Sequence, residues 1–261
     1  MNSKIAVITG ASGGIGAAAA ARFADAGYAV YGLSRHPGAD PRIRFIPCDV
    51  ARDSDVCAAF DAIREAAGSI DVLVCNAGMG ISGAAAYASD ADIARIFGVN
   101  CFGVFRCIRE ARALCHAGSQ IVIVTSAAAV FAIPFQAYYS ATKSALNSYT
   151  LALRTELAVA GIRVSAVMPG DVRTGFTDAR VKSTSGTELY GDRIEKSVAA
   201  MERDERHGMS PDAVARVIFR QIHAKNPRPL VTVGGSYKLF IFLNRILPTR
   251  LVAFLIGKMY S

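Results

Sequence analysis

Short, mostly apolar segments alternate with helix-forming segments along the first two thirds of this 261-residue chain. The apolar segments are residues 4–9, 29–34, 43–48, 70–75, 120–126 and 163–168. A short apolar run without polar alternation is typical of a strand that is covered on both faces of a parallel sheet. Strands that alternate with helices in this way predict an α/β fold, a doubly wound parallel sheet with helices on both faces and right-handed crossovers.

The composition fits one cytoplasmic domain over residues 1–261. The chain is 52% hydrophobic and 19% charged, enough to bury a core, and no linker divides it. Its six cysteines form no C-x-x-C pair and its four histidines no cluster, so we expect reduced thiols and no metal site. No secretory signal precedes the first apolar run. The net charge of +8 is spread along the chain, so we expect no nucleic-acid binding.

The first apolar run ends in a glycine-rich turn, residues 10–16, and an alanine-rich helix is expected from Ala17 to Ala26. A strand, a glycine turn and a helix together let backbone N–H groups and the helix N-terminus hold a pyrophosphate, as in a Rossmann-type sheet. The alternative is a turn whose glycines serve packing alone. Ligands of such sheets lie at the carboxyl ends of the strands, where Asn76, Ser126 and Pro169 also fall.

The second apolar run ends in Arg35 and His36. Many dinucleotide folds place an acidic residue here for the ribose 2′-hydroxyl, whereas an arginine accommodates a 2′-phosphate. Arg35 therefore predicts NADP(H), and the alternative is an ordinary solvated arginine.

Tyr139 and Lys143 lie four residues apart in a helix expected from about Gln136 to Ala160, so they share one face of it. A nearby lysine cation favours the phenolate, and we expect it to lower the pKa of Tyr139 from about 10 toward neutral pH. Tyr139 is then a candidate general acid or base. A Tyr-x-x-x-Lys pair also arises by chance, and the neighbouring Tyr138 lies off the lysine's face.

Taken together and in order, these motifs resemble the short-chain dehydrogenase/reductase family from about residue 4 to residue 175. The matching residues are Thr9, Gly10, Ser12, Gly14, Ile15 and Gly16 in the cofactor turn, Asp49 and Val50 on the adenine side, Asn76, Ala77 and Gly78 after the fourth strand, Asn100, Ser126, Tyr139 and Lys143 in the catalytic tetrad, and Pro169, Gly170, Val172 and Thr174 beside the nicotinamide. Cys75 departs from the family, where many members have asparagine. Glycines 10, 13 and 16 also fit the longer epimerase relatives, but the short chain and the Asn-Ala-Gly motif favour the reductase branch.

The resemblance implies an NADP(H)-dependent oxidoreductase that interconverts a hydrophobic ketone or aldehyde and its alcohol. Tyr139 would exchange the proton, Lys143 would tune Tyr139 and bind the nicotinamide ribose, and Ser126 would hydrogen-bond the substrate oxygen. Asn100 would hold a water that connects Lys143 to solvent. The family also implies a homodimer or a homotetramer. The alternative function is a non-catalytic dinucleotide-binding redox sensor, but a sensor has no need of a proton donor.

Residues 177–210 form a polar stretch longer than most connections, and we expect a substrate loop or lid there. Six apolar residues near the expected site favour a hydrophobic substrate, although each of them also fits ordinary core packing. They are Val130, Phe131, Ile133, Pro134, Phe135 and Phe176. Ser210 and Pro211 predict a helix start, and residues 230–233 a last strand.

The tail, residues 236–261, is apolar and carries four cations and no acid. Its uncharged runs are shorter than the roughly 18–20 residues that span a bilayer. We expect Pro248 to divide it into two short helices. It can make a peripheral contact with an anionic membrane, or close the substrate pocket or a subunit interface.

Overall fold

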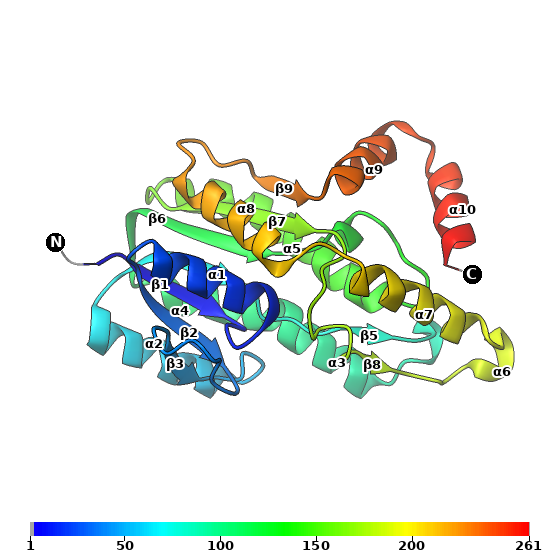
Figure 1. Cartoon of the computed structure of the whole chain (residues 1–261), viewed down its shortest axis with the longest axis horizontal. Coiled ribbons are helices and arrows are strands. Elements are labelled where there is room, and N and C mark those ends of the chain that lie inside the picture. Colours follow the sequence, from blue (N-terminus) through cyan, green and yellow to red (C-terminus); the bar gives the residue numbers. More distant parts are fainter. Residues whose placement is uncertain (1–2, 261) are drawn as a thin grey trace.

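The computed structural model describes residues 3–260 and contains a seven-stranded parallel sheet (Figure 1). The strand order is β3-β2-β1-β4-β6-β7-β9. The strands are β1 Ile5–Thr9, β2 Ala29–Ser34, β3 Arg44–Pro47, β4 Ile70–Cys75, β6 Cys115–Val124, β7 Arg163–Pro169 and β9 Leu230–Val233. The chain therefore has the doubly wound α/β fold that the apolar runs predicted.

Helices cover both faces of the sheet because successive strand residues point to opposite sides. In β1, Val7 belongs to one core, while Ala6 and Ile8 belong to the other. The first core is completed by α2 Asp53–Ala67, α4 Gly103–Arg112 and α5 Ala137–Ala158, and the second by α1 Gly14–Asp25 and α8 Pro211–His223. Because the strands are parallel, the carboxyl ends of β1, β4, β6 and β7 lie at one edge of the sheet.

Local signals account for several helix ends. The Ser210 hydroxyl accepts a hydrogen bond from the Ala213 N–H, and Pro211 is the first residue of α8, as predicted. The helix α2 occupies the residues of a helix that the sequence predicts from about Asp53 to Ala67, and Gly68, whose φ is +73°, follows its last turn. The first helix begins at Gly14, three residues before the expected start, so part of the glycine turn is helical.

The sequence predicts that a helical region capped by Ser89 or Asp90 runs on to His116, and the structure differs from this extent. The observed region consists of α3 Asp90–Phe97, the π-helical segment η2 Gly98–Phe102 and α4, and it ends at Arg112 rather than His116. The expectation of a helix up to His116 is wrong because Cys115 already pairs with Ile70 in the sheet. The Ser119 hydroxyl donates to the Ile70 carbonyl, which holds this irregular start of β6 in place.

The region after β7 is more ordered than a loop. It contains β8 Val181–Lys182, α6 Thr187–Tyr190 and α7 Arg193–Arg206, and β8 pairs with β5 Ile81–Ser82. Two short 3-10 turns, η1 Ala85–Tyr87 and η3 Ala127–Ala129, lie in the connections after β5 and β6. A role of residues 177–210 as a lid stays a prediction.

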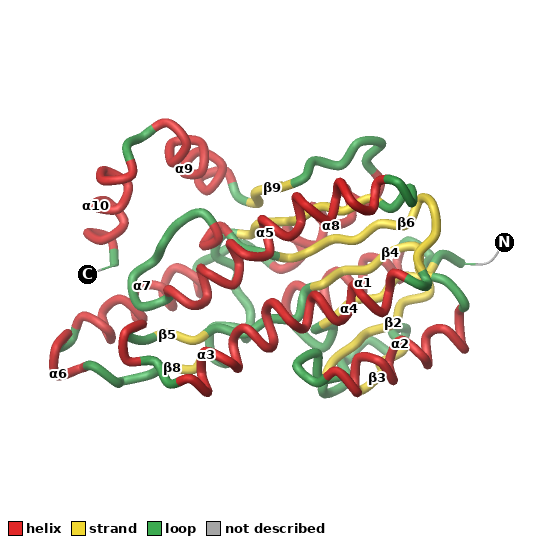
Figure 2. The backbone as a smooth tube through the Cα atoms, turned by 180° about the vertical axis from the view of Figure 1, so that it is seen from behind, coloured by secondary structure: helices red, strands yellow, loops and turns green. Residues whose placement is uncertain are grey.

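The tail folds into two helices on either side of Pro248, α9 Gly235–Ile246 and α10 Thr249–Met259, which confirms the predicted break. Figure 2 shows from behind that α9 and α10 leave the sheet after β9 as an arch. Within residues 3–260, no helix has the length and apolar character needed to cross a bilayer.

Candidate active site

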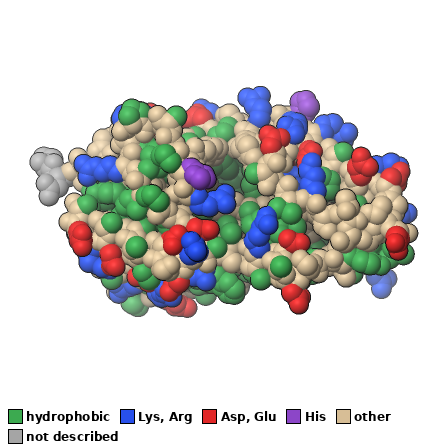
Figure 3. Space-filling model, turned by 90° about the horizontal axis from the view of Figure 1, so that it is seen from below, with side chains coloured by type: hydrophobic (Ala, Val, Ile, Leu, Met, Phe, Trp, Pro, Cys, Tyr) green, Lys and Arg blue, Asp and Glu red, His purple; other side chains and the backbone are tan. Residues whose placement is uncertain are grey.

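A cavity of about 1750 Å³ lies at the carboxyl edge of the sheet. Figure 3 shows the surface hollowed near the middle of the side that it views, with apolar side chains inside the hollow. The predicted site residues that line the cavity are Gly10, Ser12, Gly14, Ile15, Arg35, Asp49, Val50, Asn76, Ala77, Gly78, Ser126, Tyr139, Lys143, Pro169, Gly170, Val172 and Thr174. The other three predicted site residues, Thr9, Gly16 and Asn100, do not line the cavity. The fold therefore brings together residues that are up to 165 positions apart, from Thr9 to Thr174.

The glycine turn has a backbone that other residues would not adopt easily. Gly10 and Gly14 have φ angles of +66° and +54°. A side chain on Gly16 would overlap the carbonyl oxygen of Gly10. The turn and the N-terminus of α1 thus leave open backbone against the cavity, which fits the pyrophosphate of a dinucleotide.

Thr9 and Asn76 join this turn to the end of β4. The Thr9 hydroxyl accepts hydrogen bonds from the N–H groups of Asn76 and Ala77 at 2.9 and 3.0 Å. The Asn76 side-chain amide donates to the carbonyls of Thr9 and Gly10 at 3.0 and 3.3 Å. These bonds fix the two strand ends between which the middle of the cofactor would lie.

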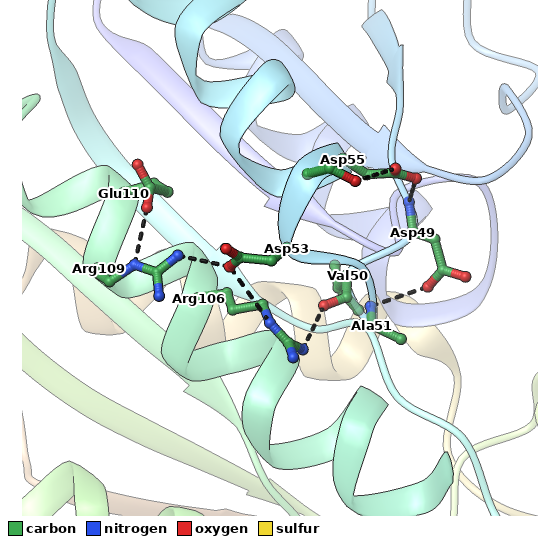
Figure 4. Close-up of polar contacts among 9 residues, drawn as sticks. Asp49, Val50, Ala51, Asp53, Asp55, Arg106, Arg109 and Glu110 are labelled. Carbon is green, nitrogen blue, oxygen red and sulfur yellow. Dashed lines mark hydrogen bonds and ion pairs between the residues drawn. The ribbon is translucent and has the colours of Figure 1, made fainter.

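The expected adenine side of the cavity is held from two helices, as Figure 4 shows for the turn after β3. The Asp49 carboxylate accepts the N–H of Ala51 at 3.0 Å, and the N–H of Asp49 donates to Asp55 on α2 at 3.2 Å. Arg106 of α4 donates to the Val50 carbonyl at 3.4 Å and lies 3.5 Å from the carboxylate of Asp53. This network holds Asp49 and Val50 against the cavity, whereas the side chain of Arg35 is exposed at its rim.

The four candidate catalytic residues come from three elements. Ser126 follows β6, Tyr139 and Lys143 lie on α5, and Asn100 lies in η2. The Lys143 ammonium is 5.7 Å from the centre of the Tyr139 ring and donates to the Val124 carbonyl at 3.0 Å. Ser126 is a hydrogen-bond partner of the Tyr139 hydroxyl. Serine, tyrosine and lysine thus form one polar cluster in an apolar cavity.

Asn100 is fully buried, and its side chain is already bonded to the protein. Its amide donates to the Met79 carbonyl and to the Thr142 hydroxyl, and its oxygen accepts the Met79 N–H at 2.8 Å. Asn100 therefore fixes the loop after β4 beside Lys143. A water held by Asn100 stays a prediction.

The pKa of Tyr139 differs from the expectation. Burial raises it to about 12, and the hydrogen bond to Ser126, which acts in the opposite direction, does not cancel this effect. Burial also lowers the pKa of Lys143, to about 8. The expected shift of Tyr139 toward neutral pH is wrong because the apolar surroundings disfavour the phenolate and the ammonium alike. Tyr139 keeps its proton at neutral pH, which suits a proton donor.

The loop after β7 closes the side of the cavity where the nicotinamide is expected. Val172 pairs with Met209, and Thr174 packs against Gly14 of the glycine turn. The Thr174 hydroxyl accepts the N–H of Phe176 at 3.2 Å, and the Phe176 ring lies 5.7 Å from the ring of Tyr139. This loop therefore connects the cofactor turn to the catalytic tyrosine candidate.

Sequence reasoning missed a buried ion pair behind Phe176. The Arg180 side chain is fully buried, pairs with Glu205 and lies over the Phe176 ring at 5.7 Å. Glu205 also accepts a hydrogen bond from Thr177 at 2.7 Å. No periodic pattern links residues 180 and 205, so only their meeting in space could show the pair.

The cavity continues under the tail, away from the glycine turn. Tyr237 of α9 donates a hydrogen bond to the Asp171 carboxylate. Burial is the main cause that raises the pKa of Asp171 above its ordinary value. The apolar lining residues on this side include Phe131, Ile133, Phe176, Phe240, Leu243, Leu247, Val252, Leu255 and Ile256.

Four residues near the expected site do not line this cavity. Val130, Pro134, Phe135 and Tyr138 are absent from its wall, in contrast to Phe131, Ile133 and Phe176. Phe135 packs instead against the cluster around α7. The Tyr138 hydroxyl donates to the Ala85 carbonyl at 3.1 Å, which separates Tyr138 from the role of Tyr139.

Comparisons of this chain with a family model, with known proteins and with solved structures show what it is similar to. Residues 4–185 match the model of the family described as short chain dehydrogenase. The 3-ketodihydrosphingosine reductase of Bacteroides thetaiotaomicron is 34% identical over 100% of this chain and 99% of its own length. The NADPH-dependent 1-acyldihydroxyacetone phosphate reductase of Saccharomyces cerevisiae is 32% identical over 84% of this chain and 78% of its own.

A solved structure of a short chain dehydrogenase/reductase from Burkholderia phymatum in complex with NAD superposes with a TM-score of 0.79. It is 25% identical and covers 93% of this chain and 92% of its own.

Proposed function

Because the chain belongs to the short-chain dehydrogenase family and is an oxidoreductase, we propose that it interconverts a hydrophobic ketone or aldehyde and its alcohol with NADP(H). The observation that carries this proposal is the placement of Tyr139 beside Ser126 and Lys143 in a cavity with apolar walls, where burial raises the pKa of Tyr139. The bound nicotinamide supplies or accepts the hydride. A sensor that does not turn over substrate would have no use for this proton donor.

In the direction of reduction, Tyr139 gives its proton to the carbonyl oxygen as that oxygen gains negative charge. The Ser126 hydroxyl donates a second hydrogen bond to the same oxygen, and the apolar walls strengthen this bond. Lys143 is charged below pH 8 and favours the phenolate that remains on Tyr139. Asn100 acts through the Met79 loop, which it holds in place.

We propose a substrate with a long apolar chain. Aromatic and aliphatic side chains of α9 and α10 extend the cavity beyond Tyr139. The names of two relatives describe reductases of an acyldihydroxyacetone phosphate and of a ketodihydrosphingosine, which supports a lipid-like carbonyl compound here.

We predict that methyl ketones of increasing chain length are reduced with increasing kcat/KM. Each buried methylene contributes about 0.8 kcal/mol, so the rise should be about two- to fourfold per methylene until the cavity is filled. The loss of NADPH absorbance measures it, with reactions lacking ketone as the control. A kcat/KM that does not change with chain length would contradict the proposed substrate class.

We propose NADP(H) rather than NAD(H) because Arg35 lies at the cavity rim after β2, where a 2′-phosphate would lie. We predict that Arg35→Asp weakens NADPH binding by about 10- to 100-fold, since a charge-assisted guanidinium–phosphate contact is lost. NADH binding should change little. Titration of cofactor fluorescence measures both, and Arg52→Asp, also at an exposed position, is the control. Equal affinity of the unmodified protein for NADPH and NADH would show that the interpretation of Arg35 is wrong.

We also propose a cytoplasmic homodimer or homotetramer. All six cysteines are free thiols, which is typical of a reducing compartment. The exposed Phe102 and Leu151 on η2 and α5 offer apolar area for contact between copies.

A further inference from the structure

The arch formed by α9 and α10, residues 235–259, has little contact with the core. Ile241 is buried, whereas no residue of α10 is. The arch follows β9 in the chain (Figure 1). Tyr260, which comes directly after the arch, packs against the apolar cluster of α7. Its two ends are thus attached to the body, and its helices lie at the surface.

The inner face of the arch lines the cavity. On α9 this face carries Phe240, Leu243 and Leu247, and on α10 it carries Val252 and Ile256. The spacing of three and four residues places each set on one side of its helix. These five apolar side chains therefore form one wall of the cavity.

The outer face of the arch is also apolar, and its large side chains are exposed. Leu239, Phe242 and Ile246 follow one another at positions i, i+3 and i+7 and are 55%, 58% and 62% exposed. Their mean direction on the helix lies about 120° from that of Phe240 and Leu247, because each residue turns the direction by about 100°. On α10, Phe254 is 65% exposed. A second apolar face without cover indicates an interaction surface.

Cations accompany this outer face. Lys238 and Arg245 flank the apolar stripe of α9, and Arg250 lies on α10, whereas Lys258 of α10 lines the cavity. Residues 235–261 contain no acid. Among residues 3–260, no carboxylate forms an ion pair with any of these four cations. The outer face thus combines exposed aromatic and aliphatic groups with unneutralised positive charge.

We propose that the outer face of the arch binds an anionic lipid surface, while its inner face lines the substrate cavity. Leu, Ile and Phe side chains enter the headgroup boundary, and the cations meet the lipid phosphates. A second copy of the chain fits this face less well, because a two-fold contact sets the same positive patch against itself. The arch then brings the cavity to the surface that holds apolar substrates.

Flotation of the full-length protein with vesicles tests this proposal independently of turnover. We expect binding to vesicles of phosphatidylglycerol and phosphatidylcholine at about 50 mM salt, less at about 500 mM salt, and little binding to phosphatidylcholine alone. The double variant Arg245→Glu/Arg250→Glu should lose at least about twentyfold in partitioning, since each basic residue at such a surface contributes about 1 kcal/mol. Its reduction of a short, water-soluble ketone should be unchanged, because neither arginine lines the cavity.

The variant Arg193→Glu/Arg220→Glu is the matched control, because it makes the same change in net charge at exposed positions of α7 and α8. It should keep vesicle binding. Equal losses in both variants would show that net charge, and not the arch, binds the lipid, and would overturn the proposal.

A variant with Phe242→Ser and Phe254→Ser tests the apolar part of the face. Loss of flotation with an unchanged molecular mass in solution supports a lipid partner. A full-length protein that does not float with anionic vesicles, and whose oligomer dissociates in this variant, would show that a second copy covers the face. A protein that floats but reduces no ketone would leave the arch proposal intact and reject the proposed function.

Discussion

Tyr139→Phe should lower turnover by about 10²–10⁴-fold, because it removes the proton donor and keeps the aromatic ring. NADPH binding should be nearly unchanged, since the ring and its contact with Phe176 remain. Single-turnover reduction of a ketone measures the first effect, and titration of cofactor fluorescence measures the second.

Tyr138→Phe is the matched control for this prediction. It removes the same atom from the adjacent residue, whose hydroxyl donates to the Ala85 carbonyl and does not line the cavity. Its effect on turnover should be severalfold at most. If Tyr139→Phe retains a turnover close to that of Tyr138→Phe, another group must donate the proton.

Lys143→Met should remove most turnover and at the same time stabilise the fold. Burial lowers the pKa of Lys143 from 10.5 to about 8. At pH 7 the free-energy cost of keeping the ammonium charged is therefore about 3 kcal/mol higher in the folded state than in the unfolded state. Leaving the Val124 carbonyl without its donor costs about 1 kcal/mol. The free energy of unfolding should rise by about 2 kcal/mol in the variant.

The pH dependence of stability gives a second measure of this effect. The unfolded chain binds more protons at residue 143 than the folded chain between about pH 8 and 10.5. The contribution of Lys143 to stability therefore rises with pH through this window, and Lys143→Met should lack that rise. Urea unfolding at pH 7 and pH 9.5 compares the two proteins, with the exposed Lys196→Met as the control. A variant less stable than the unmodified protein at both pH values would contradict the assigned burial cost.

Local patterns in the sequence determined the elements and their order. Apolar runs such as residues 70–75 form strands because a strand that is covered on both faces buries side chains pointing to either side. The glycine-rich run of residues 10–16 predicted a turn, and the structure has φ above zero at Gly10 and Gly14. Ser210 with Pro211, and Pro248, marked a helix start and a helix break for equally local reasons.

The start of β6 needed information from another strand. Residues 115–119 have no local strand signal, and they join the sheet because the Ile70 N–H donates to the Leu114 carbonyl and the Ile70 carbonyl accepts a hydrogen bond from the Ser119 hydroxyl. The local sequence pattern therefore predicted that the preceding helix extends to His116. Pairing between distant segments decided this boundary.

The sequence by itself determined which residues stand at the carboxyl ends of the strands, and so which side chains gather around Tyr139. Only the tertiary structure decided the charge state of the site, because burial depends on all elements that surround a group and not on its neighbours in the chain. The same reason applies to the pair of Arg180 and Glu205 and to the two faces of the arch. Spacing shows which residues share a face of a helix, but only packing decides whether that face meets the cavity or the solvent.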